Sequence, residues 1–351
     1  MRLTLVNGMS FEGESFGAPV STSGEVVFNT GMVGYVEGFT DPSYAGQIVV
    51  ATYPLVGNYG VPERRFFESE KIQIAGLVVS EYSEQYSHYR AKQSLANWLK
   101  ISKVPAITGV DTRAITKILR EKGVMLGQLT HSGKPRALHN PNDEHLVARV
   151  SIKRKKTYGS GAMRILLVDC GAKENIIRSL VSRGVTVIRV PWDYDFSKER
   201  YDGLLISNGP GDPTMCGETI QNVAKAYKRK KPILGICLGI QIMALAAGGK
   251  TYKLKYGHRS QNQPAIDVTN NAKRCYITSQ NHGYAVDAES LPKEWQVWMK
   301  NGNDASLEGM RHAKLPYSAV QFHPEASPGP TDTAWIFDEF IKTVEHSKKR
   351  K

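Results

Sequence analysis

The chain has 351 residues, more than a single hydrophobic core usually supports, so its length indicates two domains. Its composition, 41% hydrophobic and 23% charged, is that of an ordinary globular protein and excludes a disordered or collagen-like chain. Lysine and arginine outnumber aspartate and glutamate by 46 to 33, which gives a net charge of +13.

The positive charge is carried by the carboxy-terminal part of the chain. Residues 1–150 hold 15 basic and 14 acidic residues, which leaves 31 and 19 for the remainder. A nucleic-acid-binding protein would show basic residues interleaved with exposed aromatic residues, or a known reader motif, and neither is found. We therefore interpret the charge as a solvated surface or a docking face for an acidic protein, and expect no nucleic-acid partner.

The four cysteines show no CxxC spacing, which argues against a disulfide framework or a zinc site and favours a reducing compartment. The first 13 residues lack the apolar core of a signal peptide, so we expect a cytoplasmic protein. Residues 232–249 are free of charge and approach the length of a membrane span. Gln241 and several glycines within them suit a strand, a tight turn and a helix better, so we expect no membrane association.

Short β-rich runs separated by turn residues make up the expected first domain, residues 1–150. Residues 3–6 and 10–16 flank Asn7-Gly8 and predict a hairpin. Two helices are expected later, the second with Asp111 as its amino-terminal cap and Gly123 at its end. The strands and helices predicted after the hairpin are residues 47–53, 72–80, 88–100 and 111–122.

Residues 151–162 combine a basic run with glycine and serine, and we predict a linker there. Beyond it, short apolar strands are followed by helical patterns, which is typical of a parallel sheet with crossover helices. This second domain is expected over residues 163–345, with a basic tail over 346–351. Its predicted strands and helices are residues 165–169, 173–183, 185–190, 203–207, 218–230, 233–236, 274–279, 295–299, 306–310, 319–322 and 333–344.

The segment Gly235-Ile-Cys237-Leu-Gly239 follows an apolar strand and opens a helix. Glycines on both sides of Cys237 allow the sharp turn of a nucleophile elbow, and the helix amino terminus favours a thiolate. Buried structural cysteines are common, however, and on this segment alone that interpretation would be preferred.

A second segment favours a nucleophilic cysteine over a structural one, because His323 and Glu325 lie two residues apart at the end of an apolar strand. Strand alternation places both side chains on the same face. A histidine base oriented by a carboxylate is what a cysteine nucleophile requires. A surface histidine beside a solvated glutamate is the less favoured alternative.

The loop at residues 206–213 also follows an apolar strand, and its glycines allow backbone N–H groups to approach a ligand. In isolation this loop would be interpreted as an ordinary Gly/Pro turn. Together with the cysteine and histidine segments, it is consistent with an oxyanion-binding loop.

The motifs GPGDP, GICLGxQ and FHPE, in this order, resemble those of the class I (triad) glutamine amidotransferases, over residues 163–344. The resemblance extends over nearly the whole chain, to the small, glutamine-hydrolysing chain of carbamoyl-phosphate synthase, through residues 27–58, 109–116, 257–258 and 279–287. The resemblance implies an α/β fold, in which an N-terminal mixed β/α domain for partner docking precedes an amidotransferase domain with a mainly parallel sheet and flanking helices.

The resemblance also implies roles for individual residues. Cys237 would be the nucleophile, His323 the general acid and base, and Glu325 its orienting partner, with backbone N–H groups of Leu238 and Gly209 binding the oxyanion. The residues implied to contact glutamine are Ser43, Gly209, Gly211, Leu238, Gln241, Asn281, Gly283 and Tyr284.

The implied reaction is hydrolysis of L-glutamine to glutamate and ammonia through a γ-glutamyl thioester on Cys237. The ammonia would pass to a large synthetase chain, which would make carbamoyl phosphate from bicarbonate. No P-loop or other ATP-binding pattern is found here, so ATP and Mg²⁺ are expected on that large chain, and this chain is expected to hold no cofactor or metal.

Two alternatives remain open at the level of sequence. Ile240 stands where many relatives have histidine, which leaves a regulatory or scaffold subunit with a relic triad as one alternative. A cysteine hydrolase or peptidase is the other, disfavoured because the DPSY and QNHGY segments match recognition of free glutamine. The sequence does not decide between arginine and pyrimidine synthesis, nor does it indicate allosteric effectors or the oligomeric state.

Overall fold

The computed structural model describes residues 1–132, 137–269 and 273–349, and the chain divides into two compact units, Met1–Leu146 and Val147–Lys351. The boundary lies four residues before the predicted one (150 − 146). The predicted linker, residues 151–162, belongs to the second unit, because residues 156–158 pair with a strand of its sheet. A Cβ atom on Gly161 would lie 1.8 Å from the carbonyl oxygen of Gly184, so this glycine serves close backbone packing.

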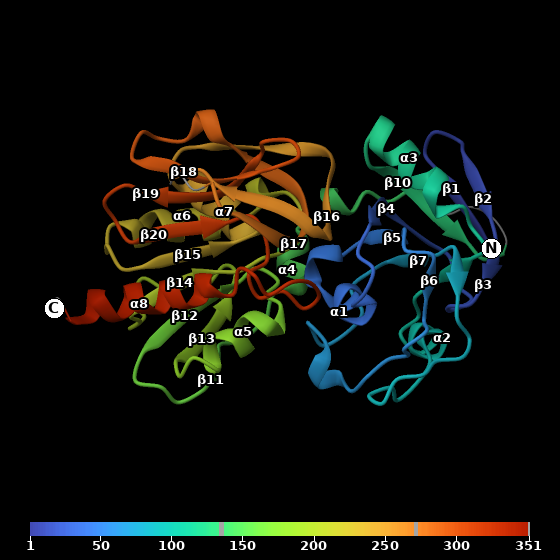
Figure 1. The fold of residues 1–351 in the computed structure, drawn as a ribbon, viewed down its shortest axis with the longest axis horizontal. Helices are drawn as coiled ribbons and strands as arrows, with labels where there is room; N and C mark the ends of the chain where they lie inside the picture. Colours follow the sequence, from blue (N-terminus) through green and yellow to red (C-terminus); the bar gives the residue numbers. More distant parts are fainter. Residues whose placement is uncertain (133–136, 270–272, 350–351) are drawn as a thin grey trace. The chain divides into compact units, whose positions relative to one another are not determined.

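The first unit is built on an eight-stranded sheet with the order β2-β1-β10-β4-β5-β7-β9-β3 (Figure 1). Its centre is parallel, since β4, β5, β7 and β9 run in the same direction, and antiparallel strands flank it on both sides. The predicted hairpin is confirmed as β1 paired with β2. The strands of this unit are β1 (Arg2–Leu5), β2 (Ser10–Glu12), β3 (Glu14–Ser15), β4 (Thr22–Asn29), β5 (Gln47–Ala51), β6 (Leu55–Val56), β7 (Gly76–Val78), β8 (Glu81–Tyr82), β9 (Ala106–Thr108) and β10 (Met125–Thr130).

Side-chain caps mark the start of both α2 and α3 in the first unit. The Asp111 carboxylate accepts a hydrogen bond from the backbone of Ala114 at 2.8 Å, and Gly123 follows the last turn, which confirms the prediction for α3. The helix predicted over residues 88–100 is wrong at its start: α2 begins after Ser94, whose hydroxyl caps it. The helices are α1 (Tyr35–Thr40), η1 (Pro42–Tyr44), η2 (Arg64–Phe66), α2 (Leu95–Ile101), α3 (Thr112–Lys122), η3 (Pro141–Asp143) and α4 (Leu146–Val150), the last of which spans the boundary.

The second unit contains a ten-stranded sheet with the order β11-β13-β12-β14-β15-β20-β19-β18-β16-β17. The central strands β13, β12, β14, β15 and β20 form the predicted parallel core. Antiparallel strands extend the sheet on both sides of this core. The strands are β11 (Lys156–Tyr158), β12 (Arg164–Asp169), β13 (Thr186–Pro191), β14 (Gly203–Ile206), β15 (Ile233–Ile236), β16 (Lys250–Asp267), β17 (Cys275–Asp287), β18 (Trp295–Asn301), β19 (Leu307–His312) and β20 (Tyr317–Val320).

Helices cover both faces of this sheet, as predicted (Figure 1). Two hydrophobic clusters lie between the helices and the sheet, one on each face. Side chains alternate along β12, so this strand contributes to both clusters. Leu166 and Val168 belong to the cluster under α6 and α7, whereas Ile165 and Leu167 belong to the cluster under α5 and α8. The helices are α5 (Glu174–Val181), η4 (Pro213–Met215), α6 (Gly217–Tyr227), α7 (Leu238–Ala246), η5 (Ala288–Ser290) and α8 (Trp335–Lys349).

Two further predictions concern single segments. Residues 346–349 of the predicted tail continue α8, because the apolar positions of this helix pack on the sheet, and residues 350–351 lie outside the described residues. Among the described residues, no helix has the length and apolarity required to cross a membrane. Residues 232–249 instead form β15, the turn at Cys237 and α7.

Candidate active site

Cys237 lies on the sharp turn between β15 and α7, with φ 54° and ψ −104°, a backbone conformation that is strained for a residue with a side chain. Its N–H donates to the carbonyl of Val320 at 2.9 Å, which ties the turn to the neighbouring strand β20. A Cβ atom on Gly239 would lie 2.3 Å from the carbonyl oxygen of Ile206, and one on Gly235 would lie 2.8 Å from the Gly239 backbone. The two glycines are therefore required for the elbow to form.

His323 and Glu325 follow the carboxyl end of β20, the strand next to β15. Nδ1 of His323 donates to Oε1 of Glu325 at 2.6 Å, and both side chains are buried. Nε2 of His323 is buried, and besides Glu325 the side chain of Cys237 interacts with this ring. The ring is thus oriented by the carboxylate and keeps its second nitrogen available for proton transfer.

Lys173 is a further member of the site that the sequence analysis did not single out. Its Nζ lies 3.1 Å from Oε1 of Glu325 and donates to the carbonyl of Ala326, while its side chain is only 2% exposed. Its backbone N–H donates to Oδ1 of Asn208 at 3.1 Å. A lysine four residues after the apolar strand β12 was the available signal, but only the fold shows that it contacts Glu325.

The charges in this cluster support one another. Burial raises the pKa of Glu325, but Lys173 and His323 lower it, to about 2. Burial lowers the pKa of His323, while the Glu325 carboxylate and Cys237 raise it, to about 10. At neutral pH the site therefore holds a carboxylate and an imidazolium next to the cysteine, so a proton is available for a leaving group.

Strand β17 faces the cysteine with its backbone. Sγ of Cys237 lies 3.8 Å from the carbonyl oxygen of Asn281, and the N–H of His323 donates to the carbonyl of Ser279 at 2.9 Å. On the neighbouring helix, Nε2 of Gln241 donates to the carbonyl of Tyr284 at 2.8 Å. The structure thus brings Asn281, Tyr284 and Gln241 to one region together with the cysteine and histidine.

The loop after β14 lies against the start of α7. A Cβ atom on Gly209 would be 2.8 Å from Cδ2 of Leu238 and 2.1 Å from the carbonyl oxygen of Cys170, so only glycine fits. Gly211 has φ 83°, which also favours glycine. Gly209 and Leu238, the two predicted oxyanion donors, are therefore neighbours at the elbow.

Known proteins match both halves of the chain. The family model described as "Glutamine amidotransferase class-I" matches residues 166–343, and the one described as "Carbamoyl-phosphate synthase small chain, CPSase domain" matches residues 3–129. The arginine-specific small chain of carbamoyl phosphate synthase from Phaeosphaeria nodorum is 49% identical over 363 residues, covering 98% of this chain and 76% of that protein. The chain belongs to the carbamoyl-phosphate synthase small chain family.

Other members of this family are parts of longer proteins. Multifunctional protein pyr-3 of Neurospora crassa is 50% identical over 97% of this chain, which spans 21% of that protein. The human mitochondrial protein named carbamoyl-phosphate synthase (ammonia) is 47% identical over 99% of this chain, which spans 24% of it. The chain thus spans about a fifth of the length of the multifunctional relative.

Ser43, the small-chain residue predicted to contact glutamine from the first domain, lies in the first unit. It is buried within η1, and its N–H donates to Oδ1 of Asp41 at 2.9 Å. Its contact with glutamine stays a prediction, as do the substrate contacts of Gly283 and the other implied residues.

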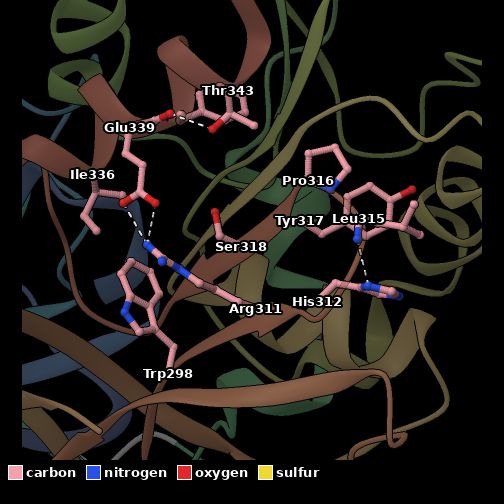
Figure 2. Close-up of a pocket in the computed structure, with 11 residues that line it drawn as sticks. Trp298, Arg311, His312, Leu315, Pro316, Tyr317, Ser318, Ile336, Glu339 and Thr343 are labelled. Carbon is pink, nitrogen blue, oxygen red and sulfur yellow. Dashed lines mark hydrogen bonds and ion pairs between the residues drawn. The ribbon is translucent and has the colours of Figure 1, made fainter. Parts of the chain in front are cut away.

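A well-defined pocket of the second unit lies away from this site. It has a volume of about 140 Å³ and lies between β19, β20 and α8 (Figure 2). Figure 2 shows Arg311 stacked on Trp298 and paired with Glu339, to which it donates at 2.7 Å. Tyr317, which lines this pocket, is the first residue of β20, whereas His323 follows the last residue of that strand. The pocket and the cysteine–histidine cluster therefore lie at opposite ends of β20.

One group in the described part of the chain has the residue types of a metal site. Potential ligand atoms of His258, His282 and Glu308 lie within 4.8 Å of one another, and all three residues are buried. They lie on β16, β17 and β19, adjacent to the catalytic cluster along β17.

Proposed function

We propose that this chain is the glutaminase component of a glutamine-dependent carbamoyl-phosphate synthase. The observation that carries the proposal is the cluster of Cys237, His323 and Glu325, with the cysteine on a strained elbow and the histidine oriented at 2.6 Å by the carboxylate. Family membership alone does not decide the nitrogen source, because one relative is named for ammonia. A complete triad with a cysteine nucleophile favours glutamine over ammonia as the nitrogen source.

In the proposed reaction, the Cys237 thiolate attacks the side-chain amide carbon of glutamine. The tetrahedral oxyanion would be bound by the N–H groups of Leu238, at the start of α7, and Gly209, its neighbour. As the C–N bond breaks, the imidazolium of His323 gives its proton to the departing nitrogen, so that ammonia and a γ-glutamyl thioester result.

Hydrolysis of the thioester would then complete the cycle. His323, now neutral, takes a proton from water as the water attacks the thioester carbonyl, and glutamate leaves as the Cys237 thiolate is restored. Throughout both steps Glu325 holds Nδ1 of the ring, and Lys173 keeps Glu325 ionised.

The ammonia would be used by a synthetase component, either a separate large chain or a further part of a longer protein. Bicarbonate, ATP and Mg²⁺ are proposed substrates and cofactors of that component. The arginine-specific name of one relative and the multifunctional name of another leave both an arginine-pathway and a pyrimidine-pathway enzyme as candidates.

The decisive test replaces the nucleophile and a matched cysteine. Cys237→Ser, assayed together with the synthetase component, should lose glutamate release and glutamine-dependent carbamoyl phosphate synthesis but keep synthesis from ammonia. Cys275→Ser changes an exposed cysteine and should retain both activities. A wild-type chain that releases no glutamate even with its synthetase component would instead support the regulatory alternative with a relic triad.

A further inference from the structure

Gln321 is a fully buried glutamine that lies between the end of β20 and the catalytic histidine. Its backbone N–H donates to the carbonyl of Glu308 on β19 at 2.8 Å. Two residues further on, the N–H of His323 donates to the carbonyl of Ser279 on β17 at 2.9 Å. These two backbone hydrogen bonds fix the segment that carries both side chains.

The side chain of Gln321 contacts Gln241, which lies on α7 four residues after the nucleophile (241 − 237). Nε2 of Gln241 donates to Oε1 of Gln321 at 3.1 Å and to the backbone carbonyl of Tyr284 at 2.8 Å. A backbone carbonyl can only accept a hydrogen bond, so the nitrogen of the Gln241 amide, and not its oxygen, faces Tyr284. Both hydrogens of this nitrogen are thus engaged, and the two acceptors hold the amide in one orientation.

The same contact fixes the amide of Gln321. Its oxygen faces the nitrogen of Gln241, because two amide nitrogens would present only donors to each other. Its own Nε2 is buried and, within the described part of the chain, has no hydrogen-bond partner. A buried donor without a partner is destabilising, and a methionine of similar length would avoid it. The acceptor oxygen is therefore what a glutamine contributes at this position.

The orientation of the Gln241 amide leaves its oxygen for a ligand. Among the described residues, the hydrogen bonds of this side chain are both made by its nitrogen. Gln241 lies beside the segment of β17 whose Asn281 carbonyl is 3.8 Å from Sγ of Cys237. An amide oxygen accepts hydrogen bonds, and it binds a charged donor more strongly than a neutral one. L-Glutamine offers one charged donor, its α-ammonium group.

We propose that Gln321 is a positioning residue: its amide oxygen holds the Gln241 amide with the oxygen toward the substrate, where that oxygen accepts a hydrogen bond from the α-ammonium group. This inference rests on the proposed glutaminase function. It assigns to the two glutamines a preference for substrates that carry an α-amino group over amides of the same length that lack one.

The test compares L-glutamine with glutaramic acid, which has the same side-chain amide and the same carboxylate but no α-amino group. Gln321→Met, assayed with the synthetase component through release of glutamate or glutarate, should lower kcat/KM for glutamine about threefold to tenfold, mainly through KM, because one hydrogen bond is lost. The value for glutaramic acid should not change. If both substrates lose activity by the same factor, Gln321 has a merely structural role and the proposal is overturned.

A double variant tests whether Gln321 acts through Gln241. Gln241→Met should itself lower the preference for glutamine over glutaramic acid. Adding Gln321→Met to it should change that preference by less than about twofold, because the amide that Gln321 orients is no longer present. Effects of the two substitutions that simply multiply would contradict the positioning role.

Gln296→Met is the matched control, because Gln296 is an exposed glutamine on β18. It should leave the substrate preference and the Tm at their wild-type values. The Tm of Gln321→Met should also stay close to that of wild type, since the substitution removes a buried donor that has no partner among the described residues. A change in preference without a loss of stability supports positioning over a structural role.

Ligand binding separates this inference from the proposed function. In a chain with Cys237→Ser, which lacks the thiol, calorimetry measures the Kd of each ligand. Adding Gln321→Met should weaken binding of glutamine about threefold to tenfold and leave binding of glutaramic acid unchanged. An unchanged preference overturns the inference alone, whereas a chain that binds neither ligand overturns the proposed function with it. Selective binding by a chain whose wild type does not hydrolyse glutamine supports the positioning role and refutes the proposed function.

Discussion

Lys173→Met should destabilise the second unit strongly, because it leaves the Glu325 carboxylate buried without its lysine. The two side chains are 2% and 0% exposed and the ion pair is 3.1 Å long. Removing one partner of a buried ion pair costs about 3–5 kcal/mol when the remaining charge is uncompensated. Because His323 still pairs with Glu325 at 2.6 Å, we expect the lower part of this range here. For a unit of this size, about 2–4 °C per kcal/mol corresponds to a fall in Tm of roughly 6–20 °C.

Lys155→Met is the matched control, because it removes a lysine from an exposed ion pair. Lys155 is paired with Glu199 at 2.7 Å, but its side chain is 45% exposed. Exposed pairs contribute about 0–1 kcal/mol, so its Tm should change by a few degrees at most. Calorimetry of both variants beside wild type measures the difference.

The pH dependence and a double variant sharpen the test. The pKa of Glu325 is lowered to about 2, so the stability that its ionised form contributes is present above its ordinary pKa of about 4.5 and is lost as pH falls toward 2. The deficit of Lys173→Met should therefore shrink below about pH 4.5. Lys173→Met/Glu325→Gln should be more stable than Lys173→Met alone; equal or lower stability would refute the reasoning from an uncompensated charge.

Two other substitutions test the elbow and the first unit. Gly239→Ala places a Cβ atom 2.3 Å from the backbone oxygen of Ile206, so it should lower the free energy of unfolding by about 1–3 kcal/mol and remove most of the glutaminase activity. Gly217→Ala is the control, because nothing lies within 4 Å of its Cβ position, and it should keep the stability and the activity of wild type. Ser43→Ala should raise the KM for glutamine about tenfold, through loss of one hydrogen bond of roughly 1–2 kcal/mol, with kcat less affected; an unchanged KM in steady-state assays would place Ser43 outside the glutamine site.

Local signals in the sequence were sufficient to predict the sharp turn at Cys237. The pattern of an apolar strand, a glycine, Cys237 and a second glycine already specifies a turn that only a few backbone conformations satisfy. The same holds for α3, where Asp111 and Gly123 mark both ends. These features depend on neighbours in the sequence and not on the rest of the fold.

Features that depend on distant partners were not predicted. The ion pair of Lys173 with Glu325 joins residues 152 positions apart (325 − 173), and no local pattern distinguishes this lysine from a solvated one. Strand β16 was missed because its buried stretch contains the polar residues His258, Arg259 and Ser260, which give no hydrophobic alternation. Glycine in residues 151–162 was interpreted as flexibility, although at Gly161 it serves close packing.

The position of β17 at the end of the ten-stranded sheet has a consequence for aggregation. A terminal strand presents unpaired backbone groups that can recruit a strand from another molecule. Here the carbonyl of Ser279 is occupied by the N–H of His323, so the segment that carries the proposed catalytic base also shields this edge. At the opposite end, β11 is only three residues long and carries the exposed Lys156, a charged edge that discourages pairing with another chain.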